Sequence, residues 1–201
     1  MIQLAGILFW AYTLGSIPTG FLLVRLLKNK DLRKIGSGST GARNAGRVLG
    51  RKGFWLTLAG DTAKGTLAVG LPLWLNSSLE GVWVALAAST AGHVWPVWLR
   101  FSGGRGVAVS LGALAVAAPL PLGVLAVVTG IVALITRRFQ ISGLVGFLSL
   151  PFAALALQRP GGEIIALTTL TAIVLYAHRA LITQTLARTP APPKKESAAH
   201  E

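Results

Sequence analysis

The sequence predicts an all-α fold, namely a polytopic integral membrane protein with seven transmembrane helices. Its 201 residues are 53% hydrophobic and only 12% charged, and the mean hydropathy is +0.65. A soluble domain usually carries about 25% charged residues, so this composition excludes that class. The apolar residues gather in seven segments, and most basic residues fall in alternate connections between them. Together these patterns predict a chain that crosses a membrane repeatedly.

The apolar segments follow one another with short connections. They run at roughly Ile2–Val24, Gly53–Leu75, Gly81–Leu99, Val107–Pro121, Leu122–Thr136, Gly143–Leu157 and Glu163–Ala177. Pro18 stands between two glycines near the inner end of the first segment, and we expect it to bend or unwind that helix. The fourth segment gives about 22 Å of helix against a ~30 Å hydrocarbon core, so we expect a thinned membrane or a broken helix there.

The basic residues predict the orientation. Of the 19 Lys and Arg residues, 17 fall on one side, in the loop 25–52, in the later alternate loops and in the tail. The other side has only Arg159, and Lys64 lies inside the second segment. The positive-inside rule therefore puts the N-terminus outside and the C-terminus in the cytoplasm. We expect residues 1–188 to form one membrane domain, and the polar, proline-rich residues 189–201 to form a disordered cytoplasmic tail.

Composition also excludes several kinds of chemistry. The chain has no cysteine, and its three histidines show no metal-ligand spacing, so we expect no metal and no cofactor. The six acidic residues are too scattered to form a pair of catalytic carboxylates. The net charge of +13 is concentrated on one side of the membrane, which favours membrane topology over binding to nucleic acid.

Two glycine-rich cytoplasmic segments carry donors suited to anions. The first combines backbone N–H groups, hydroxyls, an amide and guanidinium groups, and comprises Gly36, Ser37, Gly38, Ser39, Arg43, Asn44 and Arg47. Such donors suit a phosphomonoester and its neighbouring hydroxyls, although the Gly-Lys-Ser/Thr end of a Walker loop is missing. The second segment begins at His93 and ends in the basic turn Gly103, Gly104 and Arg105, where glycine lets an anion approach the backbone. The alternatives are a flexible linker and an ordinary cytoplasmic loop.

Other polar residues converge on the same face. Asp61 and Lys64 are three residues apart, hence on one helix face, with Asp61 at a depth of about 12 Å. Charges at that depth mark a functional interior or form a structural ion pair that joins two helices. Ser142 and His178 lie at the inner ends of two other segments.

The sequence resembles the PlsY family, the bacterial acyl-phosphate:glycerol-3-phosphate acyltransferases. The resemblance rests on GSIPTG at 15–20, GSGSTGARN at 36–44, DTAKG at 61–65 and the whole stretch 93–108, in that order. It implies a seven-span, monomeric enzyme in the lipid of the bacterial cytoplasmic (inner) membrane, with its active site on the cytoplasmic face. It also implies transfer of a fatty acyl group from acyl phosphate to the 1-hydroxyl of glycerol 3-phosphate. The products are lysophosphatidic acid and phosphate, in the first acylation step of phospholipid synthesis.

The same resemblance implies roles for individual residues. The catalytic positions are Ser37, His93 and Arg105. The substrate-binding positions are Gly36, Gly38, Ser39, Arg43, Asn44, Arg47, Gly103, Gly104, Ser142 and His178. Three departures from the family pattern stand out: Arg105 replaces the usual lysine, Ser39 and Arg43 replace the common Asn and Thr, and Leu181 replaces an expected Asn.

The residues themselves favour direct acyl transfer. An acyl phosphate is already activated, so the site must align two anionic substrates and stabilise developing negative charge. No Ser-His-Asp set surrounds Ser37 or Ser142, and the hydroxyl proton can pass either to His93 or to a substrate phosphate. The rival interpretations are a transporter or channel for an anionic solute, which requires polar residues across the whole membrane, and a structural lipid-binding protein.

Overall fold

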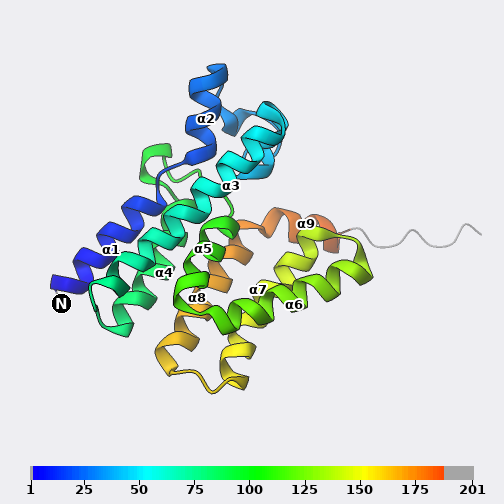
Figure 1. Cartoon of the computed structure of the whole chain (residues 1–201). Coiled ribbons are helices and arrows are strands. Elements are labelled where there is room, and N and C mark those ends of the chain that lie inside the picture. The colour runs from blue at the N-terminus through cyan, green and yellow to red at the C-terminus, as the bar shows by residue number, and fades with distance from the viewer. Residues whose placement is uncertain (1, 188–201) are drawn as a thin grey trace, which may run out of the picture.

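The computed structural model describes residues 2–187, and these residues form helices joined by short loops, with no strand among them (Figure 1). The α-helices are α1 (Ile2–Gly15), α2 (Thr19–Lys28), α3 (Ala42–Trp74), α4 (Leu79–Val94), α5 (Val107–Ala117), α6 (Pro119–Thr136), α7 (Phe139–Ala156), α8 (Gly161–Ala177) and α9 (Arg179–Leu186). Two short 3-10 turns are η1 (Leu32–Lys34) and η2 (Val97–Leu99). The all-α prediction is confirmed for this part of the chain, and the predicted disordered tail lies outside it.

The first apolar segment is broken where its proline predicted. Helix α1 ends at Gly15 and α2 begins at Thr19, because Pro18 has no backbone N–H to continue the helical ladder. Small residues then bring α1 against α4. A Cβ added at Gly15 would collide with the Ser89 backbone, and one added at Gly92 would lie 3.0 Å from Ser16 N.

Helix α3 differs from the expected loop and span. We expected a loop over 25–52, but α2 continues to Lys28 and α3 already begins at Ala42. The helix is kinked at Gly50, whose φ of 68° and ψ of −161° only glycine adopts without strain. Beyond the kink, α3 packs closely on α5, where Thr66 Oγ1 donates a hydrogen bond to Gly112 O (3.2 Å).

The fourth and fifth apolar segments meet earlier than expected. The fourth segment was predicted to reach Pro121, but α5 ends at Ala117 and α6 begins at Pro119. Proline is favoured in the first helical turn, where its missing N–H would have no partner, so the two prolines start α6 instead of ending α5. Helix α5 is continuous from Val107 behind the basic turn to Ala117, so the break at Ala118 separates the fourth apolar segment from the fifth.

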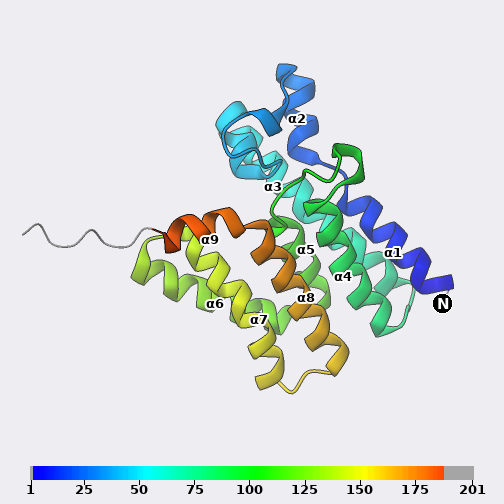
Figure 2. The same cartoon turned by 180° about the vertical axis from the view of Figure 1, so that it is seen from behind.

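The remaining helices complete the bundle. Helices α6 and α7 form an antiparallel hairpin, and α8 packs on α4 and α7 before a 66° bend leads into α9 (Figures 1 and 2). The common core includes Leu86, Leu114, Phe147 and Leu170. Within residues 2–187, four helical segments are long and apolar enough to span a membrane, or five if α8 and α9 count as one bent span.

Candidate active site

Two loops meet at one end of the bundle. They are the first loop (residues 29–41, between α2 and α3) and the glycine turn (Gly103–Gly106, before α5) (Figures 1 and 2). Thr40 N donates to Gly103 O at 3.3 Å and joins them directly. The two glycine-rich segments that the sequence singled out are thus neighbours in the fold.

Asn44 organises the first loop. The two hydrogens of its Nδ2 are shared among three backbone carbonyls, of Leu32 (3.1 Å), Ile35 (2.9 Å) and Ser39 (2.9 Å), and its Oδ1 accepts from Ser37 N (3.2 Å). The buried Asn44 amide is therefore fully engaged within the protein. Its contacts fold the loop over the first turn of α3 and leave the Ser37 side chain exposed.

Glycine lets this loop close tightly. Gly36 and Gly38 have φ angles of 58° and 71°, in the left-handed region that favours glycine. A Cβ at Gly36 would lie 3.0 Å from Arg47 Nη1, so the backbone there touches a predicted substrate-binding arginine. The loop therefore packs directly against the start of α3.

The glycine turn folds back on the end of α4. Gly103 N donates to Val94 O (3.1 Å), and Gly104 N donates to His93 O (3.0 Å). Gly104 also lies against the Nε2 edge of the imidazole, since a Cβ there would be 2.7 Å from His93 Cε1, 2.8 Å from Cδ2 and closest to Nε2. Gly106, at a φ of 81°, ends the turn and starts α5. Arg105 is held between these anchored glycines and is only partly exposed.

A buried chain of polar groups lies beneath the turn. Asp61 Oδ1 is 3.1 Å from Lys64 Nζ and 3.7 Å from His93 Nδ1, and all three side chains are 5% exposed or less. Lys64 Nζ also donates to Ile17 O (2.6 Å), at the break between α1 and α2. The predicted Asp61–Lys64 pair therefore exists, and it connects the broken first span to His93 and so to the glycine turn.

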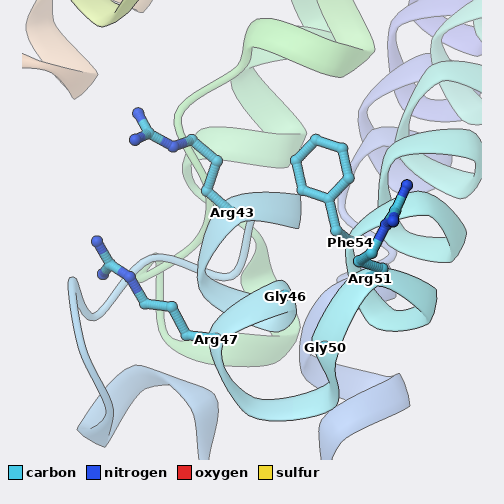
Figure 3. A pocket seen from close by; sticks show the side chains of 6 residues that line it. All are labelled: Arg43, Gly46, Arg47, Gly50, Arg51 and Phe54. Atoms are coloured by element: carbon cyan, nitrogen blue, oxygen red, sulfur yellow. The ribbon is translucent and has the colours of Figure 1, made fainter.

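Arginines line an open pocket beside the two loops. The pocket has a volume of about 510 Å³ and is lined by Arg43, Gly46, Arg47, Gly50, Arg51 and Phe54 (Figure 3). We call it the arginine pocket. The pKa of Arg105 is lowered by burial and by the positive charges of Arg43 and Arg47, so the pocket and the glycine turn share one electrostatic environment. Arg51 and Phe54 were not among the predicted site residues.

No carboxylate balances these arginines within residues 2–187. Asp31 pairs with Arg33 (2.8 Å), which lowers the pKa of Asp31 to about 2, and Glu163 pairs with Arg159 (2.9 Å) at the other end of the bundle. Asp61 is buried with Lys64, and Glu80 lies in the first turn of α4, at the end of that helix opposite His93. Clustered like charges are unfavourable when unpaired, so this surface is suited to multiply charged anions.

Ser142 and His178 differ in their relation to this site. Ser142 Oγ donates to Arg138 O (3.0 Å) and lies 3.3 Å from Thr136 Oγ1, so its hydrogen bonds close the turn between α6 and α7. His178 stands at the bend between α8 and α9, with Nδ1 2.8 Å from Val174 O. Burial and, to a lesser extent, the positive charge of Arg105 lower the pKa of His178, whereas the contacts of Ser142 stay within its own turn.

The fold and the site define a helical integral membrane protein whose polar end is rich in arginine. The chain matches the family described as "Glycerol-3-phosphate acyltransferase" over residues 5–188 and belongs to that family. The resemblance to the PlsY acyltransferases is thereby confirmed.

Curated relatives and solved structures cover nearly the whole chain. Glycerol-3-phosphate acyltransferase 1 of Desulfitobacterium hafniense is 45% identical over 92% of both chains, and that of Moorella thermoacetica is 41% identical over 90% of this chain and 92% of the relative. The crystal structure of PlsY, an integral membrane glycerol 3-phosphate acyltransferase, in its glycerol 3-phosphate form superposes with a TM-score of 0.83 at 28% identity. The lysophosphatidic acid form gives 0.81 at 26%, and each comparison covers 92% of both chains.

Proposed function

We propose that this protein transfers a fatty acyl group directly from acyl phosphate to the 1-hydroxyl of glycerol 3-phosphate. The products are lysophosphatidic acid and phosphate, and the reaction is the first acylation step of phospholipid synthesis. The observation that carries the proposal is the cluster of arginines beside a glycine turn, for which the described part of the chain supplies no carboxylate partner. Both substrates are phosphate esters or anhydrides, and such a cluster can hold two of them side by side.

The chemistry needs little more than alignment and charge. The hydroxyl oxygen of glycerol 3-phosphate bonds to the carbonyl carbon, and the bond from that carbon to the bridging phosphate oxygen breaks. The departing phosphate keeps the electron pair of that bond. Because the donor is an activated mixed anhydride, no covalent enzyme intermediate is required. Stabilisation of the developing charge by fixed cations and N–H groups lowers the barrier.

We assign the charged roles to Arg105 and Arg47, which hold phosphate oxygens. The exposed Ser37 hydroxyl aligns a substrate hydroxyl or phosphate, and Asn44 positions Ser37 through the backbone of the first loop. His93 supports the glycine turn from below, since Nδ1 faces Asp61 and the opposite edge of its ring faces Gly104. That packing favours the departing phosphate as the acceptor of the hydroxyl proton.

The remaining predicted substrate-binding residues line the two loops or flank them. Gly36, Gly38, Gly103 and Gly104 let the substrates approach the backbone. We retain Ser39, Arg43 and His178 as substrate contacts. We propose that Ser142 acts by fixing the α6–α7 turn.

We propose seven membrane crossings, with the N-terminus outside and the active site on the cytoplasmic face of the bacterial inner membrane. The part of α3 beyond Gly50 makes the second crossing, and the short α5 makes the fourth. The basic loops at the end of the bundle that carries the site support this orientation. We propose that the monomer, surrounded by membrane lipid, is the working unit.

Phosphate release by the purified protein tests the proposal. We expect release from acyl phosphate only when glycerol 3-phosphate is present, with intersecting initial-rate lines for the two substrates. Acylated protein should be absent from mass spectra after mixing with acyl phosphate alone. A burst of phosphate without glycerol 3-phosphate, together with an acyl adduct on a serine, would replace direct transfer by a covalent path.

A further inference from the structure

The arginine pocket is built by the kink in α3. Its lining residues 43, 46, 47, 50, 51 and 54 are spaced by three or four, so on a straight helix they would form one stripe. The non-helical Gly50 bends the helix in the middle of this stripe. Gly46 and Gly50 contribute no side chains, which leaves room between the arginines and Phe54 (Figure 3).

The pocket combines positive charge with an aromatic surface. Phe54 packs over Gly46, where an added Cβ would lie 3.0 Å from Phe54 Cβ, and its ring stands between Arg43 and Arg51 in the view of Figure 3. The ring of Trp55 contacts Phe54 edge to face, with ring centroids 5.0 Å apart. Trp55 and Leu56 are 59% and 55% exposed, so an apolar surface adjoins the pocket. A ligand that matches both features has a phosphate head and a hydrocarbon chain.

The arginine cluster comprises Arg43, Arg47 and Arg51 of the pocket together with Arg105 of the glycine turn, and its two ends differ in their surroundings. Arg105 lies among polar backbone in the glycine turn, which suits the small, fully polar glycerol 3-phosphate. Arg51 lies beside Phe54, at the apolar end. Arg43 and Arg47 line the pocket, and their positive charges, after burial, lower the pKa of Arg105, so they couple the pocket to the glycine turn electrostatically.

We propose that the arginine pocket is a separate subsite for the phosphate head of a single-chain acylated phosphate, with Arg51 and Phe54 as its specificity-determining residues. The occupant during turnover is the acyl phosphate donor, while the phosphate of glycerol 3-phosphate binds at Arg105. The lysophosphatidic acid product carries the same chemistry of phosphate head and single chain. This inference rests on the proposed function and adds a division of the site into two phosphate positions.

Steady-state kinetics of Arg51→Gln test the division. The substitution keeps a polar side chain and removes the charge, and we expect the KM for acyl phosphate to rise about fivefold or more. The KM for glycerol 3-phosphate should stay within twofold of the parent value. Lys52→Gln is the matched control, because Lys52 is the next residue, equally basic and exposed, but does not line the pocket. We expect it to leave both KM values unchanged.

A binding measurement keeps the test independent of turnover. Dodecylphosphonate, a non-reactive amphiphile with a phosphate-like head, should bind the protein in nanodiscs and should bind the Arg51→Gln and Phe54→Ala variants at least fivefold more weakly. In the kinetic assay it should compete with acyl phosphate and not with glycerol 3-phosphate. Weaker product inhibition by lysophosphatidic acid in Arg51→Gln would show that donor and product share the pocket, whereas unchanged product inhibition would assign it to the donor alone.

Several outcomes overturn the inference. Equal dodecylphosphonate binding by Arg51→Gln and Lys52→Gln would show that Arg51 does not bind the ligand and serves only as a positive charge that sets membrane orientation. A rise in the KM for glycerol 3-phosphate alone would assign the pocket to the other substrate. If the parent protein lacks acyltransferase activity, the proposed function fails, and the binding comparison still decides whether the pocket takes an acylated phosphate.

Discussion

Replacement of Gly104 by alanine tests how the glycine turn is built. The added Cβ would lie 2.7 Å from Cε1 and 2.8 Å from Cδ2 of His93, and still closer to Nε2, whereas ordinary contact begins at 3.4 Å. The imidazole cannot yield easily, because it is 5% exposed and lies above Asp61. The turn itself must therefore move by about 1 Å, and Arg105 moves with it. A misplacement of that size costs about 100-fold in rate, and overpacking costs about 1–3 kcal/mol of stability.

The assay compares rates and unfolding temperatures of purified variants. We expect Gly104→Ala to lose about 100-fold in kcat/KM for acyl transfer while the protein still unfolds cooperatively at a reduced Tm. Gly130→Ala in α6 is the matched control, since no atom lies within 4 Å of its added Cβ, and its activity should equal that of the parent. A Gly104→Ala variant with more than half the parent activity and an unchanged Tm would refute the reasoning, because the turn would not then depend on contact with His93.

Four further substitutions, at three residues, probe the same site. Arg105→Ala should weaken transition-state stabilisation by about 1.5–3 kcal/mol, because a charged donor to phosphate is lost, and this loss is measured as a lower kcat/KM. Arg105→Lys should retain most activity, and an alanine variant as active as the parent would remove Arg105 from the site. Asp61→Asn leaves Lys64 buried without its counter-charge and should destabilise the protein by about 3–5 kcal/mol, measured as a drop in Tm; an unchanged Tm would show that the pair is dispensable. Asn44→Ala removes four hydrogen bonds and should expose the first loop to trypsin at Arg33 and Lys34, and cleavage no faster than in the parent would contradict the organising role of Asn44.

Strong local signals in the sequence predicted much of the fold. Proline cannot continue a helical ladder, so the break after α1 could be placed at Pro18. The end of α5 was placed too late because its apolar run continues into α6 without a polar residue. The preference of Pro119 for a first helical turn was the signal that could have located the boundary.

The early start of α3 could not be predicted from composition. Residues 36–44 are rich in glycine and hydroxyls, which is typical of a loop, but α3 already begins at Ala42, after Gly41 and with no side-chain capping hydrogen bond. The Asn44 side chain bonds the loop that folds over this first turn, and those partners depend on the folded backbone. Arg51 and Phe54 were missed for a related reason. Their spacing from Arg43 and Arg47 was visible, but only the conformation of Gly50 turns that stripe into a pocket.

Contacts between segments far apart in sequence were the least predictable. Asp61 and Lys64 were paired from their spacing on one helix, but the approach of His93 to Asp61 depends on how α4 packs against α3. The same holds for Lys64 and Ile17, which are 47 residues apart. The sequence indicated that these polar residues face the same side of the membrane, and tertiary packing determines which of them touch.

The identity of the acyl donor distinguishes an acyl-phosphate enzyme from one that uses an acyl thioester. Purified protein in nanodiscs is given glycerol 3-phosphate with either a long-chain acyl phosphate or the corresponding acyl thioester, and lysophosphatidic acid and phosphate are both measured. We predict that product forms only with the acyl phosphate, with one phosphate released for each lysophosphatidic acid, because the arginine cluster binds a phosphate on each substrate. Product from the thioester and none from the acyl phosphate would contradict this account.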